Sequence, residues 1–358
     1  MTTPIAAASV NESIKLGHND AIKFGPSCLT ILPTYRCTAA CENCCFGSHP
    51  WVQGRIPQAD ILRYIDEAAA LETIDNVVFS GGECFLLGDD LYEAIGRASS
   101  LGLGTRCVTN GYWAASLPAA QRILKKCRDA GLSEINFSTG DEHAKFVPIE
   151  NILHGSRAAQ EVAIGVWLMV ELSGKRKVSK STLVEHPLAI QYFGDGGIAD
   201  IINESPWISM DEGVDPVVPH GEYLLNRDNV SQRSGCNSIL STLVVTPQKN
   251  LKACCGITSE QIPEVRLGNL DDARMHDMYR DAEQDFLKLW LAVEGPEKIL
   301  AWSAEHDPTI EWENRFAHQC DACRFMYKDE KVQRVIEEHY QERLHDVLLR
   351  YSLTGPGR

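Results

Sequence analysis

The sequence lacks the features that mark membrane proteins and nucleic-acid-binding proteins. A membrane-spanning helix needs roughly 18 consecutive apolar residues, and the longest apolar run here, Val162 to Val170, is far shorter. Basic residues are scarce, because 34 Lys and Arg stand against 49 Asp and Glu and give a formal net charge of −15. Phosphate-binding surfaces are built from clustered cations, so neither a nucleic acid nor a membrane is expected as a partner. The acidity favours a neutral or cationic substrate, or serves only solubility.

The N-terminus lacks the basic start and the apolar core of a signal peptide. We therefore expect the protein to stay in the cytoplasm, where thiols remain reduced. Thirteen cysteines in such a compartment indicate metal ligation or catalysis rather than disulfide bonds.

Short β-branched runs alternate with amphipathic helical stretches over the first part of the chain. A helix is expected at 58–71, where apolar residues recur at helical spacing. Strands are expected at 28–32, 76–80, 105–110, 134–138, 162–170 and 198–202. Repeated βα units of about 30 residues predict an α/β fold with a parallel sheet, open or curled into a barrel. Both forms place function at the carboxyl ends of the strands.

The remainder of the chain follows a different pattern. Residues 205–235 are rich in Pro, Gly and Asp and are typical of a connection. Beyond them we expect two short strands around a turn, a helical stretch over 271–304 that is interrupted at Gly295 and Pro296, and a final helix over 328–350. The expected domains are an N-terminal extension (1–27), a core (28–235), a small α+β unit (236–327) and a C-terminal helix and tail (328–358).

Three cysteines follow the first expected strand. Cys37, Cys41 and Cys44 have the spacing C-x3-C-x2-C, and three thiolates can hold three corners of a 4Fe–4S cluster while the fourth iron stays open. This motif resembles that of the radical S-adenosylmethionine (SAM) superfamily, whose members share the spacing, the location and a partial (β/α)6 barrel. Cys45 has the wrong spacing, although a slipped site that uses it is an alternative, and a structural zinc site is the rival for the motif as a whole.

Further matches to that superfamily lie at the ends of the next strands. "SGGEC" supplies Gly81, Gly82 and Glu83, and the resemblance assigns them to the methionine amine of SAM. "VTNG" supplies Asn110, and "FSTGDEH" supplies Ser138 and Asp141 as contacts of the ribose type. The alternative for the last three is an ordinary strand-end turn, because these residue types favour turns.

Two positions near these motifs differ from the pattern of the superfamily. Its members commonly carry an aromatic residue just before the third cysteine, where this chain has Asn43, with Phe46 nearby. Cys84 stands where proline is frequent. We consider it as a donor of a hydrogen atom to a substrate radical, as an epimerase would require, with a spare buried thiol as the alternative.

A second group of cysteines occupies the C-terminal third. It resembles the auxiliary-cluster extension of the same superfamily, in the shorter form called twitch rather than the longer SPASM form, because only five cysteines follow residue 235. The implied ligands of a second 4Fe–4S cluster are Cys236, Cys254, Cys320 and Cys323, with Cys255 as the alternative to Cys254.

The choice between Cys254 and Cys255 rests on two opposing signals. Strand alternation favours Cys254, whereas a glycine that the family places five residues earlier maps to Lys249 for Cys254 and to Asn250 for Cys255. Asn tolerates a left-handed turn better than Lys. A structural zinc ion on the same thiolates is the rival to a cluster.

The resemblance implies an enzyme, an oxidoreductase or maturase that reductively cleaves SAM to a 5′-deoxyadenosyl radical and takes a hydrogen atom from its substrate. The first hypothesis is modification of a ribosomally made peptide by crosslinking, epimerisation or oxidation, with electrons from a flavodoxin-type or ferredoxin-type donor. The alternatives are a small-molecule dehydrogenase of the amino-sugar type and a non-enzymatic iron–sulfur scaffold or sensor.

Overall fold

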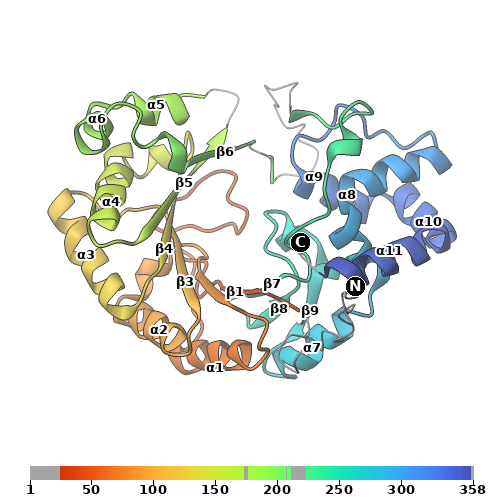
Figure 1. The fold of residues 1–358 in the computed structure, drawn as a ribbon, viewed down its shortest axis with the longest axis horizontal. Helices are drawn as coiled ribbons and strands as arrows, with labels where there is room; N and C mark the ends of the chain where they lie inside the picture. Colours follow the sequence, from red (N-terminus) through yellow and green to blue (C-terminus); the bar gives the residue numbers. More distant parts are fainter. Residues whose placement is uncertain (1–24, 173–175, 207, 211–222, 356–358) are drawn as a thin grey trace, which may run out of the picture.

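A curved nine-stranded sheet organises the protein (Figure 1). The computed structural model describes residues 25–172, 176–206, 208–210 and 223–355, so most of the predicted N-terminal extension lies outside the described residues. The strands are β1 (Cys28–Ile31), β2 (Asn76–Phe79), β3 (Gly104–Thr109), β4 (Glu134–Gly140), β5 (Gly165–Leu172), β6 (Ile202–Pro206), β7 (Thr242–Val245), β8 (Asn250–Lys252) and β9 (Arg266–Asn269). Their order in the sheet is β6-β5-β4-β3-β2-β1-β7-β8-β9, and the pairs from β6 through β1 to β7 are parallel.

Helices connect the parallel strands and cover the outer face of the sheet (Figure 1). They are α1 (Gln58–Ala69), α2 (Asp89–Ser100), α3 (Leu117–Ala130), α4 (Ile149–Glu161), α5 (Lys180–Val184) and α6 (Pro187–Phe193). Alternate strand residues such as Cys107, Phe137 and Leu168 are fully buried in the core beneath these helices, and their neighbours along each strand point to the other face. The predicted α/β class with a parallel sheet is confirmed.

Two predicted strands are displaced in the structure. The apolar run 162–170 does not form one strand, because α4 extends to Glu161 and Ala163 has a left-handed backbone with φ 56° before β5 begins at Gly165. Residues 199–201 form a turn of 3-10 helix, and β6 begins only at Ile202. In both places apolar residues that close a helical connection were attributed to the strand that follows it.

The C-terminal region continues the same sheet and adds helices beside it. β7 pairs in parallel with β1, whereas β8 and β9 are antiparallel additions. The helices are α7 (Met275–Ala282), α8 (Phe286–His306), α9 (Gln319–Lys328), α10 (Glu330–His339) and α11 (Gln341–Thr354). None of the helices in the described ranges is long and apolar enough to cross a membrane.

The breaks in these helices have local causes. α8 is interrupted at Gly295, as predicted, because its φ is 80° and a Cβ there would lie 2.6 Å from the carbonyl oxygen of Ser234. The predicted single helix over 328–350 is wrong, because α10 ends at His339 and α11 begins at Gln341. Its predicted start agrees with the structure, where the Asp329 carboxylate accepts from the backbone N–H groups of Lys331 and Val332 and caps α10.

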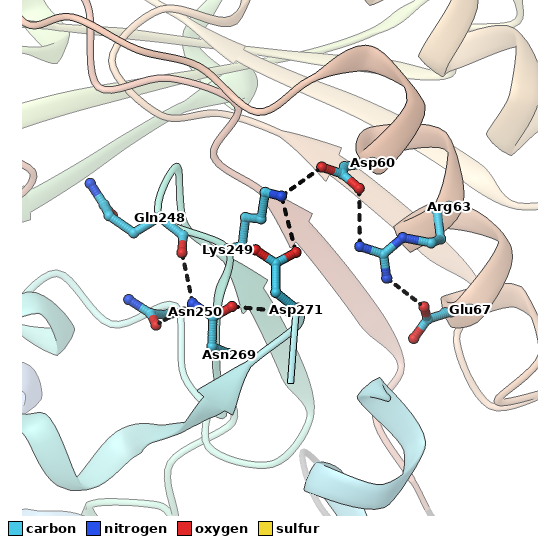
Figure 2. A network of polar contacts seen from close by, with 8 residues as sticks. All are labelled: Asp60, Arg63, Glu67, Gln248, Lys249, Asn250, Asn269 and Asp271. Atoms are coloured by element: carbon cyan, nitrogen blue, oxygen red, sulfur yellow. Dashed lines mark hydrogen bonds and ion pairs between the residues drawn. The ribbon is translucent and has the colours of Figure 1, made fainter. Parts of the chain in front are cut away.

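A polar network fastens the C-terminal strands to the first helix (Figure 2). The Lys249 ammonium lies 2.9 Å from Asp60 of α1 and 3.0 Å from Asp271 after β9. On the same helix Arg63 pairs with Asp60 at 3.1 Å and with Glu67 at 3.0 Å. Because Lys249 precedes β8, these ion pairs set the position of the chain that leads to Cys254.

Candidate active site

A cavity of about 350 Å³ lies at the carboxyl ends of the parallel strands. Its walls come from the loop after β1, the ends of β2 to β6 and the segment after β8. Seven of the residues predicted for the SAM cluster and the SAM site line it: Cys37, Cys41, Cys44, Gly81, Gly82, Asn110 and Ser138. Another hollow, of about 510 Å³, lies between α1 and α7 and contains none of the predicted site residues.

Four cysteines of the loop line this cavity: the three predicted ligands Cys37, Cys41 and Cys44, and also Cys45. Backbone N–H groups of Ala39 and Ser48 donate to the sulfurs of Cys37 and Cys44, both at 3.4 Å. Burial is the main cause that raises the pKa of Cys37 to about 11 and that of Cys41 to about 12, and the carboxylates of Glu83 and Glu171 and the Cys44 thiol act in the same direction. The predicted ligands thus line one cavity, with N–H donors aimed at two of the sulfurs, and this donor set fits a cluster with three thiolate ligands.

Gly81 and Gly82 allow the end of β2 to approach the cysteine loop. A Cβ on Gly81 would lie 2.5 Å from the Thr34 carbonyl oxygen, and one on Gly82 would lie 2.2 Å from that of Arg36. The Gly82 N–H donates to the Thr34 carbonyl at 2.9 Å. The two glycines thus seat the loop against the strand end, in addition to lining the cavity.

Glu83 lies below the cavity wall and is fully buried. Its carboxylate accepts from the Thr109 hydroxyl at 2.9 and 3.0 Å and from the backbone N–H groups of Asn110 and Phe85 at 3.0 and 3.1 Å. Burial raises the pKa of Glu83 to about 7, although these donors favour the charged form. In this structure Glu83 ties the end of β2 to the turn after β3, and its contact with an ammonium group stays a prediction.

Thr109 is a site residue that the sequence did not single out. Its hydroxyl donates to Glu83 and accepts from the Gly111 N–H and the Trp113 indole N–H, both at 3.1 Å. Asn110 beside it donates to the Cys37 sulfur at 3.5 Å and to the Thr38 hydroxyl at 3.0 Å. The turn after β3 therefore connects the carboxylate to the cysteine loop.

The acidic residues near the end of β4 are placed differently from expectation. Asp141 does not line the cavity, and its carboxylate accepts from the Val178 N–H at 2.7 Å. Glu142, His143 and Glu171 line the cavity instead, with His143 Nδ1 3.2 Å from the Glu171 carboxylate. Glu171 belongs to β5, where only its position near a strand end could have indicated a site. Asn43 and Phe46 also line the cavity.

Cys84 is placed away from the cavity. It is fully buried, and its thiol donates to the Val108 carbonyl oxygen at 3.4 Å beside Cys107. This placement favours the alternative reading of a core thiol over a hydrogen-atom donor.

The second thiol group gathers four of the five C-terminal cysteines. A Cβ at Gly256 would lie 3.1 Å from both the Cys254 and the Cys320 sulfurs. Burial raises the pKa of Cys323, and Cys254, Cys236 and Cys320 raise it further. Because these thiols influence one another and are enclosed by protein, the set fits a closed site with four thiolate ligands.

Lys249 and Cys255 bear on the choice within the adjacent pair. Lys249 lies five residues before Cys254 and has a left-handed backbone with φ 62°. This is the position where the family glycine is expected if Cys254 is the ligand. Cys255 differs from Cys254 because it is exposed and lines the first cavity. Ser238 contacts both: the Cys255 N–H donates to the Ser238 hydroxyl at 3.0 Å, and the Ser238 Oγ lies 3.0 Å from the Cys255 sulfur and 3.6 Å from the Cys254 sulfur.

Comparison with known proteins connects this chain with one sequence family and one curated relative. Residues 31–167 match the sequence profile of the radical SAM superfamily. A Bacillus subtilis (strain 168) protein, YydG, which is named as a peptide biosynthesis protein, is 29% identical over 178 residues, or 49% of this chain and 53% of YydG. The chain thus spans about half the length of this curated relative.

Solved structures share the fold of this chain. Native anSMEcpe with bound AdoMet and Cp18Cys peptide superimposes with a TM-score of 0.52 at 14% identity, over 90% of this chain and 98% of that one. Native anSMEcpe with bound AdoMet alone gives the same values. At this identity the likeness concerns the fold alone, and proteins with the matching sequence profile are enzymes that bind a 4Fe–4S cluster and SAM. The part of this chain that is similar to the radical SAM superfamily, residues 31–167, carries the cysteine loop and the ends of β2, β3 and β4.

Proposed function

We propose that this protein is a radical SAM enzyme that epimerises a residue of a ribosomally made peptide. The observation that supports epimerisation over the other peptide modifications is the thiol of Cys255. All thirteen cysteines lie in the described part of the chain, and Cys255 is the single exposed one among them. It lines the same cavity as Cys37, Cys41 and Cys44.

The cysteine loop would supply the cofactor side of this reaction. Cys37, Cys41 and Cys44 would hold a 4Fe–4S cluster whose open iron binds SAM, and Gly81 and Gly82 would line the SAM site. When bound, these groups supply a 5′-deoxyadenosyl radical that takes a hydrogen atom from a C–H bond. The cavity walls would position the target carbon and keep other hydrogen donors away.

Cys255 would supply the second half of an epimerisation. Inversion at a carbon needs a hydrogen atom returned to the face opposite the one that lost it. Cys255 follows β8, more than 200 positions after the cysteine loop, so the two reacting groups reach the cavity from separate segments. The S–H bond would break as the new C–H bond forms, which leaves a thiyl radical. One electron from a flavodoxin-type or ferredoxin-type donor and one proton would restore the thiol.

The peptide class of the substrate is supported by the relatives rather than by the site. YydG is named for peptide biosynthesis, and anSMEcpe was solved with a peptide bound. The fit of Cys236, Cys254, Cys320 and Cys323 to a second cluster adds an enclosed metal site beside Cys255. We propose that this cluster serves the reaction by exchanging single electrons near that thiol.

The test uses the anaerobically reconstituted protein with dithionite, SAM and the short peptides encoded beside its gene. In D2O the proposal predicts a product that gains one deuterium at an inverted carbon, detected by mass spectrometry and by chiral analysis after hydrolysis. Cys255→Ala should still form 5′-deoxyadenosine but yield no inverted residue, and Cys84→Ala should behave as the wild type.

Each other outcome would count against the proposal in a distinct way. A product lighter by two hydrogen atoms would indicate crosslinking or dehydrogenation. Inversion that persists in Cys255→Ala would remove Cys255 as the donor. No 5′-deoxyadenosine from any preparation that contains its iron would support the scaffold alternative.

A further inference from the structure

We propose that His306, His339 and Glu342 form a binding site for one zinc ion, separate from the thiol groups. The three residues come from three helices: His306 is the last residue of α8, His339 is the last residue of α10, and Glu342 lies in the first turn of α11. One ligand atom from each lies within 4.8 Å of the others. Among the described residues this is the one group of His, Cys, Asp and Glu that meets this criterion.

The distances between these atoms are close to those around a bound zinc ion. His306 Nε2 lies 3.3 Å from one Glu342 carboxylate oxygen, and His339 Nδ1 lies 3.0 Å from the other. For metal–ligand bonds of about 2.0–2.1 Å in a tetrahedral arrangement, neighbouring ligand atoms are about 3.3 Å apart. A zinc ion would therefore require only small shifts of side chains that already face one another.

The ring geometry also favours a cation between these groups. The two imidazole rings are stacked, with centroids 4.3 Å apart and planes 25° apart. A divalent ion can bind one nitrogen of each ring and the carboxylate of Glu342 at the same time.

The surroundings leave the site accessible to an ion. The nearby arginines have acidic partners, since Arg334 pairs with Asp307 and Arg343 with Glu294. The Trp302 ring packs against His306 with centroids 4.7 Å apart, which restricts that imidazole. The Glu342 side chain is 51% exposed, so water can occupy the fourth position.

The ligand types select the ion. Two imidazoles and one carboxylate suit zinc, whereas magnesium and calcium prefer oxygen ligands throughout. Because the ligands join the ends of α8, α10 and the start of α11, the ion would hold these helices together. The part of α8 before the break at Gly295 contacts the second thiol group, because the Leu291 carbonyl accepts from the Cys236 N–H at 2.8 Å, and the ion would bind the part after that break.

The experiment measures zinc binding to protein whose iron sites are already filled. Anaerobically reconstituted protein is dialysed against 65Zn2+, and bound zinc and iron are counted together. We expect one zinc per chain with no loss of iron, and an absorption-edge spectrum with nitrogen and oxygen neighbours but no sulfur shell. Glu342→Gln should weaken binding at least tenfold, and the double variant His306→Asn with His339→Asn should abolish it.

The control variant is His276→Ala, an exposed histidine on α7 that lies 3.4 Å from Asp277, and it should bind zinc as the wild type does. Unchanged zinc in the double variant, a sulfur shell in the spectrum, or zinc that appears only as iron is lost would each overturn the site. Absence of zinc from wild-type protein that has its full iron content would overturn it as well. Because Glu342→Gln keeps the size of the side chain, its zinc content separates ligand loss from misfolding.

Discussion

The two thiol groups differ in how the chain brings them together. Cys37, Cys41 and Cys44 lie within eight consecutive positions of one loop and face a cavity. Cys236, Cys254, Cys320 and Cys323 come from three segments: the chain before β7, the chain after β8, and helix α9. The first group is local in sequence and open, whereas the second is assembled by tertiary structure and enclosed.

Because of this difference, the two groups depend on folding in different ways. A local loop can gather its thiols once β1 and the glycines of β2 are in place. The enclosed group requires β7 to β9, α8 and α9 to be packed together, so a metal bound there stabilises that packing in return. We therefore expect loss of the first group to remove activity and loss of the second to weaken the C-terminal region.

The largest effect should follow replacement of Cys37, Cys41 and Cys44 together by alanine. Two 4Fe–4S clusters correspond to about eight irons per chain, and this variant should retain about four. Cleavage of SAM should become undetectable, while the apparent melting temperature stays near that of the wild type. Cys45→Ala is the control and should keep both iron and activity. Loss of SAM cleavage in Cys45→Ala would instead indicate the slipped site.

Removal of a ligand from the enclosed group should give the converse result. Cys323→Ser should also retain about four irons, but it should still form 5′-deoxyadenosine. Its apparent melting temperature should fall, because the buried thiol site on α9 is left incomplete. Cys255→Ala is the matched control, since it should keep about eight irons. If instead Cys255→Ala loses iron and Cys254→Ala does not, the assignment of the pair is reversed.

The open site could be predicted from sequence to a large extent. Carboxyl ends of adjacent parallel strands meet at one edge, so motifs that follow successive strands must converge. Cys37, Gly81, Asn110 and Ser138 accordingly line one cavity. What the pattern could not give is the direction of each side chain: Glu83 turns below the wall because Thr109 and backbone N–H groups bind it there.

The enclosed group could be predicted from sequence only in part. The cysteines could be grouped, but the sequence could not decide between Cys254 and Cys255, and the left-handed residue that bears on this choice is Lys249. Backbone preference disfavours Lys in a left-handed turn. Lys249 nonetheless has that conformation, and its ammonium group forms ion pairs with Asp60 and Asp271. Contacts between segments distant in sequence decide such cases, and a single sequence does not contain them.

A smaller effect should follow replacement of Asn110, whose side-chain amide contacts the open group of Cys37, Cys41 and Cys44. Asn110 donates to the Cys37 sulfur, and such a bond stabilises the more negative, reduced cluster. Loss of about 1 kcal/mol of hydrogen bonding corresponds to about 40 mV for a one-electron couple. Asn110→Ala should therefore lower the potential of the SAM cluster by about that amount, measured by electron paramagnetic resonance during redox titration.

Asn151→Ala provides the control for this shift. Asn151 is buried and its side-chain amide donates to the carbonyls of Gly111 and Tyr112 in the same turn, at 3.3 and 3.2 Å, so that both of these bonds go to oxygen and not to sulfur. It should loosen the turn while leaving the potential within about a third of the shift seen for Asn110→Ala. An equal shift in both variants would attribute the effect to the turn rather than to the bond to sulfur.

The smallest effect concerns Lys249, whose backbone conformation bears on the choice between Cys254 and Cys255. A left-handed backbone costs a residue with a Cβ roughly 1–2 kcal/mol relative to glycine. Lys249→Ala would lose the ion pairs and keep this strain, whereas Lys249→Gly would lose the ion pairs and relieve it. Lys249→Gly should therefore melt about 2 °C above Lys249→Ala, with iron content unchanged in both, as followed by thermal unfolding of the loaded protein. If alanine is as stable as glycine, position 249 is not left-handed, and the alignment that favours Cys254 over Cys255 loses its structural support.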